Sequence, residues 1–311
     1  MSWVVWILAS AFFLALYDLA KKASVRENAV LPVLLCSTLF GSLALLGFLA
    51  ATGRLASAFS ALNGRVLWLG LSKSVLVAAS WVFTFYGLRT LPITIATPIR
   101  ASSPALVFLA ALFLYGEVPT CLQGLGMLLV FAGYWTFSWA GRHEGIDFLH
   151  NRAVWCAVVG AMLSACSSLW DKYIFQVVAS PVEPTQLVFQ VGLVLVYALC
   201  LLPFLHQPPQ PPKPPKPSKP PKPPKPPKLP NPSFSFRWPI PFVGILLVFS
   251  DWLMFNGVSI PGTPVSVAAL LRRFSVAITF VLGALFFHET NLRRKGLALV
   301  LVLAGIALLV L

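Results

Sequence analysis

The sequence predicts an all-α membrane protein of ten transmembrane helices, arranged as two inverted five-helix repeats. Three observations support this prediction. Hydrophobic residues make up 58% of the 311-residue chain and charged residues only 10%, whereas a soluble domain carries about 25% charged residues. The apolar residues form long runs joined by short connections, and the second half of the chain repeats residue types of the first half at matched spacing.

The apolar runs set the number of helices. A bilayer core of about 30 Å requires roughly 20 apolar residues in a helix that rises 1.5 Å per residue. The first run lacks a preceding basic segment, so we interpret it as a membrane helix rather than a cleavable signal peptide. We expect helices over residues 3–20, 30–51, 66–88, 93–115, 121–140, 153–176, 185–205, 238–259, 264–287 and 292–311.

One segment departs from this pattern. Residues 208–232 read PPQPPKPPKPSKPPKPPKPPKLPNP, and proline this dense favours a polyproline II helix with three residues per turn. The lysines recur every three residues and would form one cationic stripe. They account for much of the net charge of +14, so this charge gives little support to nucleic-acid binding. The segment is either a low-complexity insertion without a functional role or a contact for anionic headgroups or an acidic partner.

The two halves repeat one another. A shift of 172 residues aligns residues 92–133 with the second half, and a shift of 153 aligns Leu16-Tyr17-Asp18 with Leu169-Trp170-Asp171. Insertion of the proline segment into the second half explains the different shifts. The residue pairs aligned by the longer shift include Pro92/Pro264, Ala96/Ala268, Arg100/Arg272, Ser103/Ser275, Phe108/Phe280, Glu117/Glu289 and Gly124/Gly296.

This repeat predicts the domain organisation. Because each half holds an odd number of helices, two successive copies enter the membrane from opposite sides. The result is an inverted repeat, which is typical of secondary transporters with a substrate site between the halves. We expect an N-terminal repeat at 1–142, a C-terminal repeat at 151–205 plus 237–311, and an exposed Pro/Lys-rich loop at 206–236.

Two segments carry a family resemblance. YGEVPTCLQGLGMLLVFAG and HETNLRRKGLALVLVLAG each contain a Glu-(x)6-Gly pattern. With the ten expected helices, these segments resemble the EamA-type branch of the drug/metabolite transporter superfamily, over the whole chain except 206–236. The resemblance implies alternating access, transport of small metabolites such as amino acids, drugs or phosphorylated sugars, and a cavity lined by helices 1, 3, 4, 6, 8 and 9. The small multidrug branch has a glutamate in the middle of helix 1, whereas the first carboxylate here is Asp18, near the helix end, which argues against multidrug–proton antiport.

Charged residues within the apolar runs are the candidate site residues. A charge in hydrocarbon costs at least about 2.5–3.5 kcal/mol, so charges that persist there usually face protein or water. Arg100 and Arg272 occupy equivalent repeat positions, about eight residues into their expected helices, and guanidinium groups suit carboxylates and phosphates. We therefore expect an anionic or zwitterionic substrate. The alternative is that these arginines pair with Asp251 or helix-end carbonyls and hold the bundle together. The full candidate substrate-binding set is Arg100, Arg272, Arg273, Lys73, Trp81 and Tyr86.

Three aspartates are candidate coupling or gating residues: Asp251, Asp18 and Asp171. Asp251 lies near the middle of the expected helix 238–259 and is our first candidate for a proton- or ion-coupling carboxylate. Its alternative role is that of a counter-ion to Lys73, Arg272 or Arg273.

Two further charged groups lie near helix ends. Asp18 shares a helix face with Lys21 and Lys22, which predicts an interfacial ion pair or, alternatively, a gate. Asp171 and Lys172 are adjacent and should find separate partners.

Glu117 and Glu289 each precede an expected helix. A negative charge is favoured near a helix N-terminus, so we expect a structural role for both.

No enzyme signature accompanies these residues. The sequence has no HExxH, phosphate-binding glycine loop or serine elbow, and its four histidines lack metal-ligand spacing. We expect no enzymatic activity, no cofactor and no metal. The expected partners are a small-molecule substrate and the lipid bilayer, with no nucleic acid and with a homodimer left open. We expect a multi-pass protein of a bacterial inner membrane. The alternatives are a carrier for lipid-linked polyprenyl phosphates and a non-transporting scaffold that docks through its Pro/Lys segment.

The basic residues near expected helix ends give an orientation. Most lie on the side opposite the N-terminus, so the positive-inside rule places both termini outside, whereas the resemblance implies both inside. With the five native cysteines replaced, a cysteine added at either terminus should react with an impermeant thiol reagent in intact cells. Absence of labelling would favour the orientation that the resemblance implies.

Overall fold

The computed structural model describes most of the chain in six long stretches. These cover residues 2–25, 28–90, 103–118, 120–139, 152–205 and 234–275, with helical positions also at 278, 282, 300, 301, 303–305, 307 and 308. The expected loop 206–236 and the repeat positions Arg100 and Glu289 lie wholly or mainly outside these residues.

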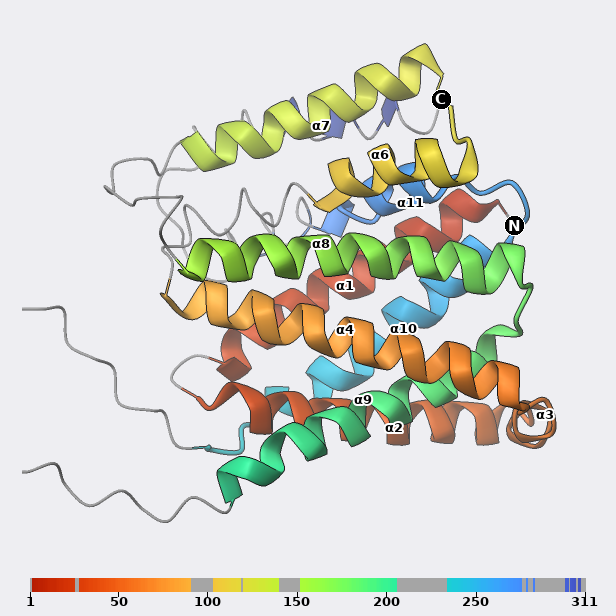
Figure 1. The fold of residues 1–311 in the computed structure, drawn as a ribbon, viewed down its shortest axis with the longest axis vertical. Coiled ribbons are helices and arrows are strands. Elements are labelled where there is room, and N and C mark those ends of the chain that lie inside the picture. Colours follow the sequence, from red (N-terminus) through yellow and green to blue (C-terminus); the bar gives the residue numbers. More distant parts are fainter. Residues whose placement is uncertain are drawn as a thin grey trace, which may run out of the picture.

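Every regular element in the described residues is a helix (Figure 1). The elements are α1 (Trp3–Val25), α2 (Val30–Ala51), α3 (Leu55–Ser60), α4 (Gly64–Thr90), α6 (Ser103–Tyr115), α7 (Cys121–Trp139), α8 (Arg152–Lys172), the π-helix η1 (Tyr173–Val177), α9 (Val182–Leu205), α10 (Pro239–Ser259) and α11 (Val265–Leu271). The long helices run side by side, and their connections gather at two ends of the bundle. The end that carries α3 is called the α3 end below.

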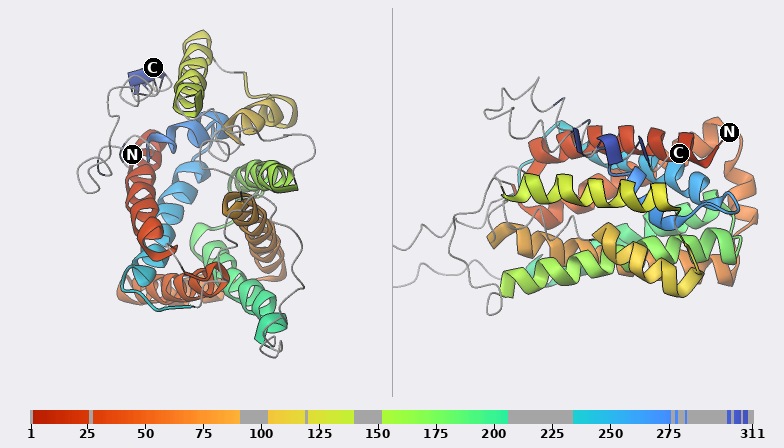
Figure 2. Two further views of the ribbon diagram at one scale, coloured as in Figure 1. Left: turned by 90° about the vertical axis from the view of Figure 1, so that its left-hand side faces the viewer. Right: turned by 90° about the horizontal axis from the view of Figure 1, so that it is seen from above.

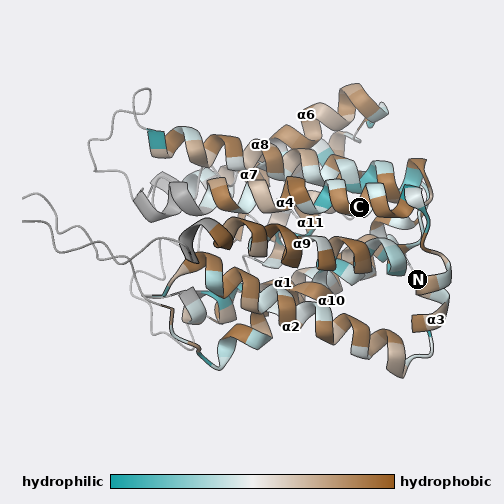
Figure 3. Cartoon of the chain, turned by 60° about the horizontal axis from the view of Figure 1, so that its bottom comes forward, coloured by the Kyte–Doolittle hydropathy of each residue, from teal (hydrophilic) through white to brown (hydrophobic). Residues whose placement is uncertain are grey.

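Six of these helices are long and apolar enough to cross a membrane: α1, α2, α4, α8 with η1, α9 and α10. Within α6 and α7, shorter apolar stretches run over Leu106–Tyr115 and Cys121–Gly133. Large apolar side chains such as Phe113 and Leu199 are exposed on the outer surface, and hydrophobic residues dominate the helices (Figure 3). A bundle of helices satisfies its own backbone hydrogen bonds, which a lipid solvent requires. The all-helical membrane fold is therefore confirmed for the described residues.

Two details differ from the sequence prediction. The short helix α3 occupies a segment that we expected to be a connection. The helix expected over 264–287 is not continuous, because α11 ends at Leu271 and a turn follows at Arg272 and Arg273. There the Arg273 amide bonds the Leu270 carbonyl at 2.9 Å, a spacing of three residues rather than four. Arg272 therefore lies at the C-terminal end of α11, where a turn interrupts the expected helix.

Helices of the first half (α1 to α7) pack mainly against helices of the second half (α8 to α11). The helix α10 packs on α1 and α2, while α4 packs on α8 and α9. These contacts correspond under the sequence repeat: α1 with α10 matches α8 with α4, and α2 with α10 matches α9 with α4. Figure 2 shows the same interleaving in a view down the bundle. The core of the molecule is thus the interface between its halves.

Small residues allow these helices to approach closely. A Cβ added to Gly41 in α2 would lie 2.9 Å from the carbonyl oxygen of Gly244 in α10, and one added to Gly244 would overlap the carbonyl of Ser37. Small residues let helix backbones meet in membranes, where no hydrophobic effect drives helices together. The crossing of α2 and α10 therefore depends on glycine at both positions.

Replacing Gly244 with alanine should destabilise the protein. The added methyl group meets backbone rather than a movable side chain, and overpacking of a tight core costs about 1–3 kcal/mol or more. The matched control is Gly47→Ala, since a Cβ at Gly47 on α2 meets nothing within 4 Å. Thermal unfolding of both variants in detergent measures the difference. Equal melting temperatures would show that the crossing can relax.

Candidate functional site

A buried ion pair joins the two halves. The ammonium of Lys73 in α4 donates to a carboxylate oxygen of Asp171 in α8, and the two side chains are only 3% and 8% exposed. One residue earlier on each helix, the indole of Trp170 donates to the Ser72 hydroxyl at 3.2 Å. Two neighbouring polar contacts therefore fix α4 against α8.

Aromatic rings complete the surroundings of Lys73. Its ammonium nitrogen lies 4.9 Å from the ring centroid of Phe189 in α9 and 4.7 Å from that of Phe255 in α10. The Phe255 ring packs against Phe175 at a centroid distance of 4.9 Å. A cation within about 6 Å of a ring face is attracted by the ring quadrupole, more strongly when water is absent. These rings favour a charged Lys73.

A second ion pair lies nearby, within the second half. Arg272 follows α11 and donates through Nη2 to Asp251 of α10 at 2.6 Å and to the Ser250 hydroxyl at 3.0 Å. The Ser250 hydroxyl donates to the Ser10 carbonyl of α1 at 2.9 Å, and the Ser10 hydroxyl donates to the Ser250 carbonyl at 2.7 Å. These contacts connect Arg272 to the first half through a buried pair of serines.

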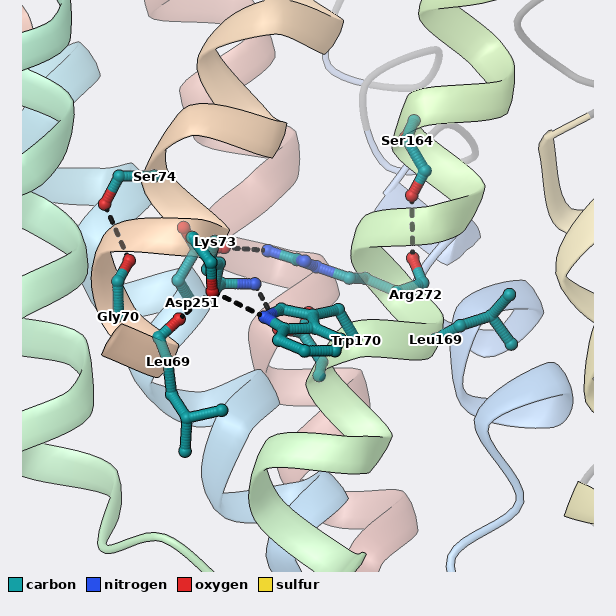
Figure 4. A network of polar contacts seen from close by, with 12 residues as sticks. Leu69, Gly70, Lys73, Ser74, Ser164, Leu169, Trp170, Asp251 and Arg272 are labelled. Atoms are coloured by element: carbon teal, nitrogen blue, oxygen red, sulfur yellow. Dashed lines mark hydrogen bonds and ion pairs between the residues drawn. The ribbon is translucent and has the colours of Figure 1, made fainter. Parts of the chain in front are cut away.

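The two ion pairs form one cluster. Lys73, Asp251 and Arg272 converge in Figure 4, and Asp171 interacts electrostatically with Lys73, Asp251 and Arg272. Two positive and two negative side chains thus offset each other inside the bundle. The Nε atom of Arg272 is buried and has no hydrogen-bond partner among the described atoms, so one guanidinium donor is uncommitted.

Glu117 forms another contact between the halves, at the α3 end. It follows α6, and its carboxylate accepts from the Lys172 ammonium of α8 at 2.5 Å. It also accepts from the backbone amides of Val265 and Ser266 at 2.8 and 3.1 Å and from the Ser266 hydroxyl at 2.6 Å. Glu117 therefore caps the N-terminus of α11.

The charge state of Glu117 follows from these contacts. Burial raises the pKa of Glu117, but hydrogen bonds from Lys172, Ser266 and Val265 outweigh it, so that the net pKa lies below the usual 4.5. Glu117 is therefore ionised at neutral pH.

Aromatic side chains surround another lysine near the end of α1. The Lys21 ammonium lies 5.3 Å from the Tyr17 ring and 5.8 Å from the Trp81 ring. Trp81 stacks on Tyr197 at a centroid distance of 6.5 Å, and the buried Tyr197 hydroxyl has no partner among the described atoms. Trp81 thus packs between helices of both halves.

Comparison with known proteins identifies the family. The sequence profile of the EamA-like transporter family matches the chain over residues 1–139 and again over 151–311. The chain belongs to the EamA-like transporter family. This family lies in the drug/metabolite transporter superfamily, so the predicted resemblance is confirmed. The match also supports a multi-pass membrane protein of a family that transports small molecules.

A solved structure shares the fold of this EamA-like protein. It is titled only "Crystal structure of protein" and matches with a TM-score of 0.73 at 16% sequence identity. The match covers 99% of this chain and 98% of that one. A comparison with curated protein sequences finds no match.

The structure brings only some of the candidate residues together. The cluster contains four of them: Lys73, Asp171, Asp251 and Arg272. Trp81 lies beside Tyr197. Arg273 is half-buried in the turn after α11. Asp18 is half-buried on α1 and is not a member of this cluster. Arg100 and the side chain of Tyr86 lie outside the described residues. Among the described residues, no group of His, Cys, Asp and Glu is placed to hold a metal ion.

Two predicted pairings are settled by the structure. Asp171 and Lys172 have separate partners, Lys73 and Glu117, as their adjacency predicted. Glu117 caps a helix N-terminus as expected, but that helix is α11 in the opposite half rather than the following α7. The sequence contains no signal for this choice, because helix order along the chain does not give helix neighbours in space.

Replacing Glu117 with glutamine should lower the melting temperature at pH 7. The side-chain amide oxygen of glutamine can still cap α11, but the Lys172 ammonium loses its ionised partner. Breaking a buried ion pair costs about 3–5 kcal/mol. A carboxyl whose pKa is lower in the folded state stabilises that state above its unfolded pKa, and this stability is lost as pH falls through the folded pKa. The difference between variant and wild type should therefore shrink below about pH 4.5.

The control for this variant is Glu183→Gln. Glu183 pairs with Arg54 at 3.2 Å, but these side chains are 27% and 52% exposed, and exposed pairs contribute only about 0–1 kcal/mol. Melting curves of both variants across pH make the comparison. A pH-independent loss for Glu117→Gln would contradict the assigned charge state.

Proposed function

We propose that this EamA-like protein is a secondary transporter that moves a small zwitterionic or anionic metabolite by alternating access. Its working unit is a pair of inverted five-helix halves, ten helices in all, with no enzymatic step. The matched contacts of α10 with α1 and of α4 with α8 support related halves, and the double family match supports the repeat.

One observation carries the alternating-access proposal: among the residues that the structure describes, three ion pairs join the halves in sequence from the α3 end inward. Arg54 with Glu183 is exposed, Lys172 with Glu117 is largely buried, and Lys73 with Asp171 is deeply buried. The helix α4 starts at this end and α8 finishes there (Figure 1). Lys73 lies nine residues into α4, about 13 Å from its start at 1.5 Å per residue. We interpret these three ion pairs, which lie at increasing depth, as the closed gate at the α3 end of the bundle.

Ion pairs suit a gate because they give specificity without large net stability. The desolvation cost of a buried pair offsets most of its Coulomb attraction. The two halves can therefore separate at this end without a large loss, provided that water reaches the charges as they part. Apolar packing of the same area would make opening more costly.

The substrate class follows from the cluster around Arg272. A purely cationic site would select anions, but Asp251 accompanies Arg272 at 2.6 Å. The uncommitted Nε donor of Arg272 suits a carboxylate or phosphate oxygen, while Asp251 suits an ammonium group. A ligand with both charges would satisfy both side chains, which favours a zwitterion over a simple anion.

A ligand panel tests this proposal. Purified protein in detergent is heated with leucine and threonine as zwitterions, glutamate and glucose 6-phosphate as anions, and spermidine as a cation. A bound ligand at 100 times its Kd stabilises the folded state by about 2.7 kcal/mol. Zwitterions or anions should raise the melting temperature, and Arg272→Gln should remove the rise.

The control variant is Arg65→Gln, since Arg65 is exposed at the start of α4 and should leave the response unchanged. Stabilisation by spermidine alone would contradict the substrate class. An unchanged response in Arg272→Gln would contradict the role of Arg272.

A further inference from the structure

We propose that Asp171 is the proton-binding carboxylate of this protein, and that its protonation opens the Lys73–Asp171 link between the halves. A proton taken from water adds to a carboxylate oxygen of Asp171, which becomes a neutral acid, while Lys73 keeps its own proton and charge. The net change is one added positive charge in the cluster. The use of this step in transport rests on the proposed function, but the proton-binding event itself does not.

The two aspartates that are buried among the described residues differ in their partners. Asp251 accepts from Arg272 at 2.6 Å, and the same guanidinium nitrogen also donates to Ser250. A guanidinium keeps its charge at any accessible pH, and here one of its nitrogens holds both Asp251 and Ser250. Asp251 is therefore paired with a permanent cation. Asp171 instead pairs with a single ammonium, which is a rounder donor on a flexible stem.

Lys73 has a second environment that tolerates its charge. The rings of Phe189 and Phe255 lie within 5 Å of its ammonium nitrogen, and this attraction does not require a charged Asp171. A neutral Asp171 would therefore leave the ammonium over two ring faces rather than unpaired in an apolar core. Asp171 can therefore take its proton from water while Lys73 keeps its own proton. It need not receive the proton of Lys73.

The charged groups facing Asp171 come from several elements. Lys73 approaches from α4, Asp251 from α10 and Arg272 from the turn after α11. Lys172 is its neighbour on α8 but points to Glu117. Asp251 disfavours a second anion beside it, whereas Lys73 and Arg272 favour the anion. Protonation of Asp171 thus removes one of two close negative charges and leaves Asp251 with Arg272.

The position of Asp171 gives the protonation a mechanical consequence. Its ion pair is the innermost of the three described ion pairs that join the halves from the α3 end. Immediately after Asp171 and Lys172, α8 widens into the π-helix η1, a local irregularity that is frequent at functional sites. Loss of the charge on Asp171 would weaken the gate where the helix backbone is least regular.

Infrared spectroscopy tests this proposal without a known substrate. Full-length protein in lipid bilayers is titrated from pH 8 to pH 4 while the C=O stretch of buried protonated carboxylic acids is recorded. Wild type should gain one band on acidification, and Asp171→Asn should lack it. Asp251→Asn should keep it. Lys73→Met should show the band at higher pH than wild type, because the variant has lost the cation that favours the carboxylate.

Replacing the Phe255 ring distinguishes proton binding at Asp171 from a purely structural ion pair. Phe255→Leu should show the band only at lower pH than wild type, because the ammonium is then less stable beside a neutral Asp171. Retention of the band in Asp171→Asn, its loss in Asp251→Asn alone, or no band in wild type would each overturn the proposal. Thermal unfolding confirms that each variant is folded, and Phe255→Leu keeps the proposal testable if Asp171→Asn fails to fold. A negative result leaves ligand stabilisation through Arg272 unaffected, so the two proposals fail separately.

Discussion

The close crossing between helices of opposite halves is the constraint on which the rest of this structure depends. In lipid, apolar helices gain nothing by leaving the solvent, so association relies on van der Waals contact and polar bonds. Gly41 and Gly244 bring α2 and α10 into backbone contact, and the serine pair at Ser10 and Ser250 joins α1 to α10. Because the strongest helix contacts run between halves, neither half has a core of its own among the described residues.

The ion pairs add specificity to this packing. Lys73 finds Asp171 only when α4 and α8 have the correct register, and Glu117 finds α11 only when the halves meet at the α3 end. Wrong registers would leave charges unpaired in hydrocarbon, at a cost of about 2.5–3.5 kcal/mol each or more. The charges that we propose for gating therefore also select the closed arrangement of the helices.

Much of this fold could be predicted from the sequence, and less of the site. Helix positions follow from the length of apolar runs, and the repeat and the Glu-(x)6-Gly pattern indicated the family. The pairing of charges did not follow. Asp251 had three candidate partners, and Arg272 was chosen by the turn after α11, which hydropathy does not reveal. Lys73 and Asp171 are 98 positions apart, and only the interleaving of halves brings them together. Nothing in the apolar runs around Phe189 and Phe255 marks their rings as neighbours of the Lys73 ammonium.

The contact of Gly41 with Gly244 has a consequence for motion. Two helices whose backbones touch at one point cannot slide past each other there, but they can tilt about that point. Such a contact acts as a pivot, and the displacement of each part of a helix grows with its distance from the pivot. Half of a 20-residue helix is about 15 Å long, so a tilt of roughly ten degrees moves its tip by about 2–3 Å, comparable to helix shifts in known switching proteins. A small tilt at these two glycines would therefore suffice to separate hydrogen-bonded charges at a helix end, while the crossing itself stays closed.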